Sequence, residues 1–150
     1  MEYKQFKEAE TEYTLKAQKK EFKRAKILCS QDASSYARNF YRDDIEIYES
    51  TFLLMLNRAN NTIGYAKISQ GGICGTVVDI RIMLKYAIDS LATGIMLIHN
   101  HPSGNLNASP QDIHISRKLK EACGWMDITF MDSIILTSES YCSLADEGLI

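Results

Sequence analysis

Two histidines and an aspartate lie close together in the stretch HNHPSGNLNASPQD, and these residue types can ligate a metal. If a strand ends at IHNH, His99 and His101 point to one face, because side chains alternate along a strand. Asp112 follows across a turn-rich loop, in a predicted helix whose apolar stripe shares its face. Two imidazoles and a carboxylate are a ligand set suited to Zn²⁺, with a fourth position left for water.

The same stretch also has a structural explanation. Ser109, Pro110 and Asp112 are typical of a helix N-cap, a proline at the first helical position and an acid at the positive end of the helix. Capping explains the serine and the aspartate, but it does not explain two histidines on one face of a strand. The two interpretations can both hold, since the cap would bring Asp112 toward the histidines.

A hydrolase of amide bonds also needs a general base. Metal-activated water loses a proton, and some group must return that proton to the leaving nitrogen. Glu46 and Glu49 both lie just ahead of the apolar run TFLLMLN, which is a candidate neighbour of the strand that leads into His99. A solvated acid at a strand start would explain either glutamate equally well, so the residues alone leave the base open.

The hydrophobic patterns predict strands separated by helices, and therefore an α/β fold with a mixed sheet flanked by helices. Glycines in GGICGTVVD indicate a turn or bulge, and Gly94 is expected to close the second helix. The expected strands cover residues 11–17, 51–57, 62–69, 95–98 and 127–137. The expected helices cover residues 31–41, with Ser30 as N-cap, 80–92, 110–123 and a short terminal segment within 138–148.

Composition limits the classes of protein and partner. The 150 residues suit one compact core, and the net charge of −2 provides no overall basic field for nucleic acid. A local exception is the segment Lys16–Lys26, with six basic residues and one glutamate, which is also typical of a solvated helix face or tail.

The four cysteines show no CxxC pair, and no apolar run approaches the length of a membrane span. Because no signal peptide is recognisable, we expect a cytoplasmic protein with reduced thiols and no membrane association.

A family resemblance adds to these patterns. His99, His101, Ser109 and Asp112 reproduce the spacing of the JAMM signature of JAB/MPN-domain metalloproteases, and HNHPSG resembles its bacterial RadC branch. The segments YESTFLLMLNRANNTIGYAKIS, GGICGTVVDIR and YCSLADEGLI are also similar to RadC-type sequences. The resemblance predicts a RadC-type JAB/MPN domain over 45–150, preceded by an extension over 1–44 with the basic segment and one helix.

This resemblance implies a fold, an activity and roles for individual residues. The fold implied is the cytidine deaminase-like α/β sandwich, and the activity is zinc-dependent hydrolysis of peptide or isopeptide bonds in an unidentified peptide or protein substrate. Zinc would be bound by His99, His101 and Asp112, while Ser109 would hydrogen-bond the developing oxyanion. Glu49 would be the general base, with Glu46 as the fallback.

The alternative implied by the RadC branch is a DNA-associated accessory protein of a repair system or mobile element, which would be catalytically inactive even if it binds zinc. Two departures from the family pattern stand in the sequence. The proline follows Ser109 instead of preceding it, and Asp132 is followed by Ser133 where the family often has a histidine.

Overall fold

The structure is a computed structural model, which describes residues 23–71 and 77–150 of the chain. The strand expected over 11–17, residues 16–22 of the basic segment and Cys74 lie outside the described residues. The five strands are β1 (Ser50–Leu56), β2 (Thr62–Gln70), β3 (Gly94–Asn100), β4 (Thr129–Leu136) and β5 (Tyr141–Ser143). The helices are α1 (Ser30–Ala37), a 3₁₀ turn η1 (Arg38–Phe40), α2 (Ile80–Asp89) and α3 (Pro110–Trp125).

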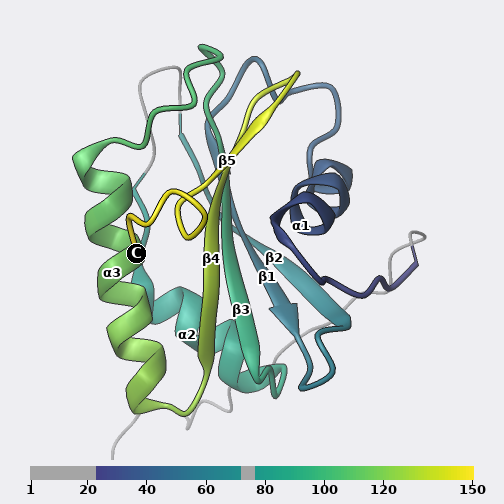
Figure 1. Cartoon of the computed structure of the whole chain (residues 1–150), viewed down its shortest axis with the longest axis vertical. Helices are drawn as coiled ribbons and strands as arrows, with labels where there is room; N and C mark the ends of the chain where they lie inside the picture. The colour runs from purple at the N-terminus through teal and green to yellow at the C-terminus, as the bar shows by residue number, and fades with distance from the viewer. Residues whose placement is uncertain (1–22, 72–76) are drawn as a thin grey trace, which may run out of the picture.

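The strands form one mixed sheet in the order β2-β1-β3-β4-β5 (Figure 1). β1 is antiparallel to both β2 and β3, whereas β3 and β4 are parallel. Every residue of β1 and β3 is buried, which agrees with the apolar runs over 52–56 and 95–98. The predicted α/β fold with a mixed sheet is therefore confirmed.

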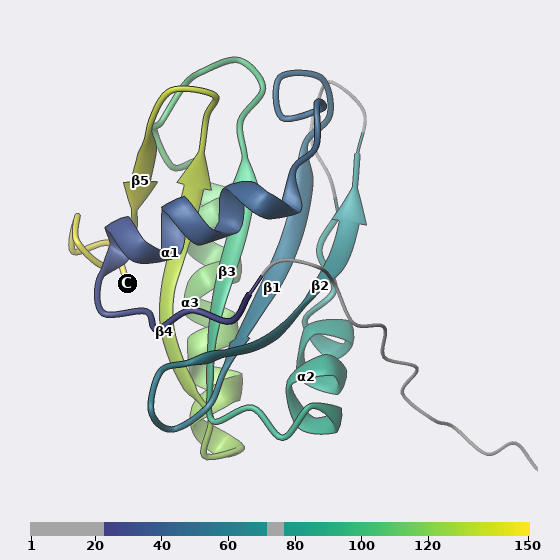
Figure 2. The same cartoon turned by 90° about the vertical axis from the view of Figure 1, so that its right-hand side faces the viewer.

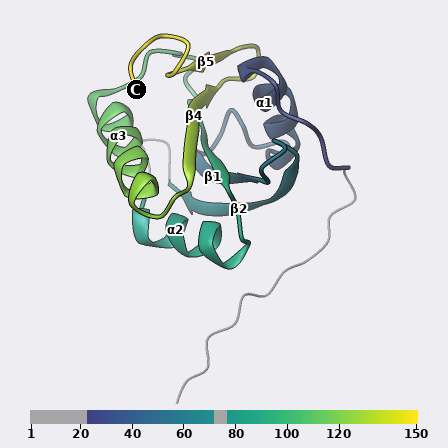
Figure 3. The ribbon, with the colours of Figure 1, turned by 60° about the horizontal axis from the view of Figure 1, so that its bottom comes forward.

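Helices cover the two faces of the sheet. α1 crosses one face, as Figure 2 shows, while α2 and α3 lie on the opposite face (Figures 1 and 3). Two apolar cores result: Leu54 and Ile98 pack on the α1 side, whereas Leu53 and Leu97 pack on the α3 side. Side chains alternate along a strand, so His99, two positions after Leu97, also faces α3. His99 is one of the candidate metal ligands.

The first helix differs from its prediction. Its N-cap is Cys29 rather than Ser30, and no side chain caps the helix. Ser30 instead donates its hydroxyl hydrogen to the carboxylate of Asp146, a contact across 116 positions of sequence that local patterns do not reveal. Ala33 and Ala37 are fully buried in the core on this side of the sheet, so α1 packs with the strands of the predicted 45–150 domain. The boundary at residue 44 itself stays a prediction.

Two further predictions near element ends are wrong. α2 ends at Asp89, with Leu91 at a left-handed φ of 57°, and Gly94 opens β3 instead of closing the helix. The expected terminal helix is replaced by β5 and turns, because residues 141–143 hydrogen-bond to the free edge of β4. Among the described residues, no helix is long and apolar enough to span a bilayer.

Candidate metal centre

The end of β3 carries both histidines. His99 is only 5% exposed, and His101 continues the strand because its N–H donates to the carbonyl of Leu136 at 2.9 Å. The chain then turns back: the N–H of Gly104 bonds the carbonyl of His101, and Gly104 adopts a φ of 82° that glycine tolerates best. This turn lets α3 begin beside the strand end, with Asp112 in its first turn.

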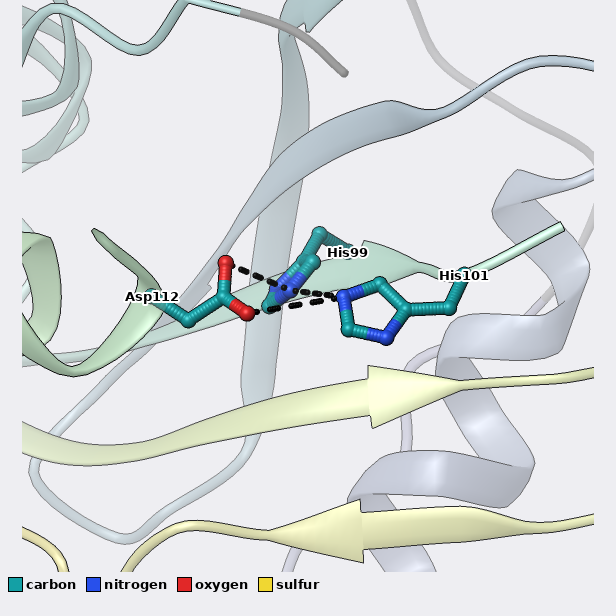
Figure 4. Close-up of side chains that lie close together, drawn as sticks. All are labelled: His99, His101 and Asp112. Carbon is teal, nitrogen blue, oxygen red and sulfur yellow. Dashed lines mark hydrogen bonds and ion pairs between the residues drawn. The ribbon is translucent and has the colours of Figure 1, made fainter. Parts of the chain in front are cut away.

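The three predicted ligands meet at one point, as Figure 4 shows. The two Nε2 atoms of His99 and His101 lie 3.2 Å apart. The carboxylate of Asp112 places Oδ1 at 3.3 Å from His99 Nε2 and Oδ2 at 3.5 Å from His101 Nε2. Ligand atoms of a tetrahedral zinc, at bond lengths of about 2.0–2.1 Å, lie about 3.3 Å from one another. One ligand atom from each side chain lies within 4.8 Å of the other two, so the three side chains are close enough to share one metal ion.

A hydrogen bond at Nδ1 of His101 orients the imidazole ring. His101 Nδ1 lies 2.6 Å from the carbonyl oxygen of Asn105. A carbonyl oxygen can only accept, so Nδ1 carries a hydrogen, and in the neutral ring Nε2 then has its lone pair available for a metal. Such a hydrogen bond behind a ligating histidine is the usual means of orienting the ring.

The helix cap holds the carboxylate in place. Ser109 Oγ accepts from the N–H of Asp112 at 3.1 Å, and Asp112 Oδ2 accepts from the N–H of Ser109 at 2.7 Å, which completes a capping box. The capping prediction is confirmed, and the same bonds orient Asp112 toward the histidines. Ser109 itself is exposed, and its predicted contact with an oxyanion stays a prediction.

The charges within the triad favour an ionised aspartate. Burial alone would raise the pKa of Asp112, but hydrogen bonds from His101 and His99 outweigh it and hold that pKa far below its ordinary value. Conversely, the Asp112 carboxylate raises the pKa of His101, although burial opposes the shift. An anionic ligand at this point adds electrostatic attraction for a cation.

A cavity of about 140 Å³ opens beside the triad. Glu49 lines this cavity together with His99 and Asp112, whereas Glu46 is exposed and does not line it. The sheet register explains the difference, because Thr51 pairs with His99 and Glu49 lies two positions earlier in the chain. The other lining residues are Thr51, Val77, Val78, Leu97, Gln111 and Ile115.

Asn100 has a role that the sequence did not reveal. Its side chain is fully buried on the α1 side of β3, opposite to the two histidines. Asn100 Nδ2 donates to the carbonyls of Ile45 at 2.6 Å and Tyr48 at 2.8 Å, and its Oδ1 accepts from the N–H of Ser50 at 2.8 Å. Asn100 thus ties the strand that carries both histidines to the loop that carries Glu49. The only sequence signal was a polar residue inside a buried strand.

Thr51 and Gln111 were also missed, and both line the cavity. Thr51 had a weak signal, since it follows Glu49 by two positions in a buried strand and therefore shares its face. Gln111 precedes a predicted ligand, but nothing in its residue type distinguishes it from other residues at a helix start.

Comparison with known proteins gives a consistent family. The model of the RadC-like JAB domain family matches residues 27–149. A UPF0758 protein of Flavobacterium johnsoniae is 43% identical over 102 residues, which cover 68% of this chain and 44% of that protein. A UPF0758 protein of Salinibacter ruber is 35% identical over 137 residues, or 91% of this chain and 58% of that protein. This chain spans about half the length of the curated relatives it matches. Because the match covers nearly all the described residues, the chain belongs to the RadC-like JAB domain family.

Proposed function

We propose that the protein is a metal-dependent hydrolase of peptide or isopeptide bonds, with zinc as its metal. The observation that carries the proposal is the cluster of His99, His101 and Asp112 beside a cavity lined by Glu49. The two imidazole Nε2 atoms lie 3.2 Å apart, and each lies within 3.5 Å of one carboxylate oxygen of Asp112. A general base next to an open metal position is the arrangement that hydrolytic zinc sites require.

The chain's own residues have separate roles in this reaction. His99, His101 and Asp112 would hold the ion, which supplies Lewis-acid polarisation of the scissile carbonyl and lowers the pKa of water. Glu49 takes the proton from the attacking water and delivers it to the departing amine nitrogen. Ser109 donates its hydroxyl hydrogen to the developing oxyanion, since its Oγ accepts from Asp112 and its own hydrogen remains available.

The substrate is proposed as an unidentified peptide or protein. A location in the cytoplasm is supported by Cys29, Cys123 and Cys142, which are all free thiols in the described part of the chain.

A pair of variants tests the proposal on the full chain. His101→Ala removes one ligand and should abolish zinc retention, measured by mass spectrometry of the metal after dialysis. Glu49→Gln should retain zinc but reduce cleavage of a peptide library by about 10²-fold or more, because the general base is lost. Glu46→Gln is the matched control and should change neither, since Glu46 does not line the cavity. Wild-type protein that binds no zinc under metal-replete conditions would overturn the proposal.

A DNA-associated accessory role is the second candidate, and the basic segment Lys16–Lys26 favours it. Binding to phosphates would weaken steeply with salt. Deletion of residues 16–26 should then abolish DNA binding at low salt, and a wild-type protein that binds no DNA there would exclude this role.

A further inference from the structure

The cavity beside the ligand triangle has an apolar wall that hydrolysis of an amide does not require. Leu97 lies two positions before His99 on β3, and Ile115 lies three positions after Asp112 on α3. β3 and α3 run in opposite directions (Figure 1). Because Leu97 precedes His99 and Ile115 follows Asp112, both residues lie on the same side of the ligands. Val77 and Val78, just ahead of α2, complete this wall.

Part of this wall is more exposed than core packing explains. Leu97 is buried in the core, and Val78 and Ile115 pack half-buried against it. Val77, however, is 89% exposed at the rim of the cavity. An apolar surface next to water gains free energy when another apolar group covers it. Because Val77 lines the same cavity as His99 and Asp112, the covering group would belong to the molecule that enters this cavity.

The volume of the cavity limits what can enter. About 140 Å³ is close to the roughly 150 Å³ of an apolar cavity that accepts one benzene molecule. It is well below the roughly 300–1,000 Å³ of pockets that hold whole drug-sized ligands. One branched aliphatic side chain therefore fits, whereas a folded element does not.

The charges at the polar side of the cavity limit which substrate side chain can enter it. Glu49 and Asp112 both present carboxylates to the same space. An acidic side chain would face like charges there and is therefore disfavoured.

We propose that Val77, Val78, Leu97 and Ile115 form a specificity subsite that takes one aliphatic side chain of the substrate, next to the scissile bond. This inference rests on the proposed function, because it places the reactive carbonyl at the ligand triangle while the side chain fills the apolar wall. Burial of a leucine-sized side chain corresponds to about tenfold to a hundredfold in affinity.

Binding without turnover tests the subsite. Three probes are compared by methyl NMR on the full chain, with and without zinc: the methylamides of N-acetyl-leucine, N-acetyl-alanine and N-acetyl-aspartate. The leucine probe should bind at least about tenfold more tightly than the alanine probe and shift the methyl signals of Val78, Leu97 and Ile115. The aspartate probe should bind most weakly. Equal binding of all three probes would overturn the subsite.

Two exposed residues provide variants that will fold. Val77→Asp adds a charge at the rim of the cavity and should remove the preference for leucine. Leu28→Asp is its matched control, because Leu28 is also exposed, at 75%, but does not line the cavity. A leucine preference that survives Val77→Asp unchanged would contradict the subsite. Zinc retention without any leucine preference refutes the subsite alone, whereas leucine preference without zinc retention supports the subsite and refutes the proposed function.

Discussion

Replacement of Asn100 by alanine should destabilise the protein more than its small change in volume suggests. The substitution leaves the N–H of Ser50 and the carbonyls of Ile45 and Tyr48 without their partner. A buried polar group without a partner costs about 1–3 kcal/mol, and a partly hydrated one costs less. The bond from Ser50 is buried, whereas the two carbonyl bonds are partly buried. We therefore expect a loss of about 2–5 kcal/mol in the free energy of unfolding.

Urea unfolding followed by circular dichroism measures this loss. The exposed Asn107→Ala is the control, and it should change stability by less than about 0.5 kcal/mol. Asn100→Asp keeps an acceptor for Ser50 but loses both donors and buries a charge, so it should be at least as destabilising as alanine. A loss below about 1 kcal/mol for Asn100→Ala would refute the reasoning, since it would mean that water replaces all three bonds without cost.

Asn100→Ala also distinguishes the positioning of Glu49 from the positioning of the candidate metal ligands. His99 and His101 are held by the pairing of Thr51 with His99 and by the bond from His101 to Leu136. Zinc retention should therefore persist in folded Asn100→Ala, while hydrolysis falls because the loop with Glu49 loses its anchor. Loss of zinc together with hydrolysis would show that Asn100 supports the ligands instead.

Ser109→Ala should lower the free energy of unfolding by about 1 kcal/mol, because the N–H of Asp112 loses its capping acceptor. Thermal denaturation measures this loss, and an unchanged stability would contradict the capping bond. Burial raises the pKa of Asp132 above its ordinary value, despite hydrogen bonds from Ser143 and two backbone N–H groups. The folded state thus favours the protonated acid, and this contribution to stability is present below about pH 4 and lost as pH rises through the raised pKa. Asp132→Asn lacks this loss, so its stability relative to wild type should rise as the pH increases above about 4 in urea unfolding. A pH-independent difference would contradict the shift.

The local parts of the metal centre could be predicted from the sequence. Strand alternation indicated that His99 and His101 share a face, and helical periodicity with the cap residues indicated that Asp112 points inward. Both patterns depend on residues within one element or its immediate flank, and the structure brings the three side chains together. The α/β class followed for the same reason, because long apolar strands and periodic helices are local signals.

Tertiary structure decided everything that depends on pairing between distant segments. Glu49 and Glu46 are equivalent in local sequence, and only the register that pairs Thr51 with His99 brings Glu49, rather than Glu46, to the cavity. Local sequence does not distinguish Asn100 from other polar residues. Only the fold places the loop before β1 against its side chain. The terminal segment carried a helical pattern, but the free edge of β4 offered it strand pairing. Hydrogen bonds between segments far apart in the chain leave no periodic trace in the sequence, and these bonds position the proposed base beside the candidate metal ligands.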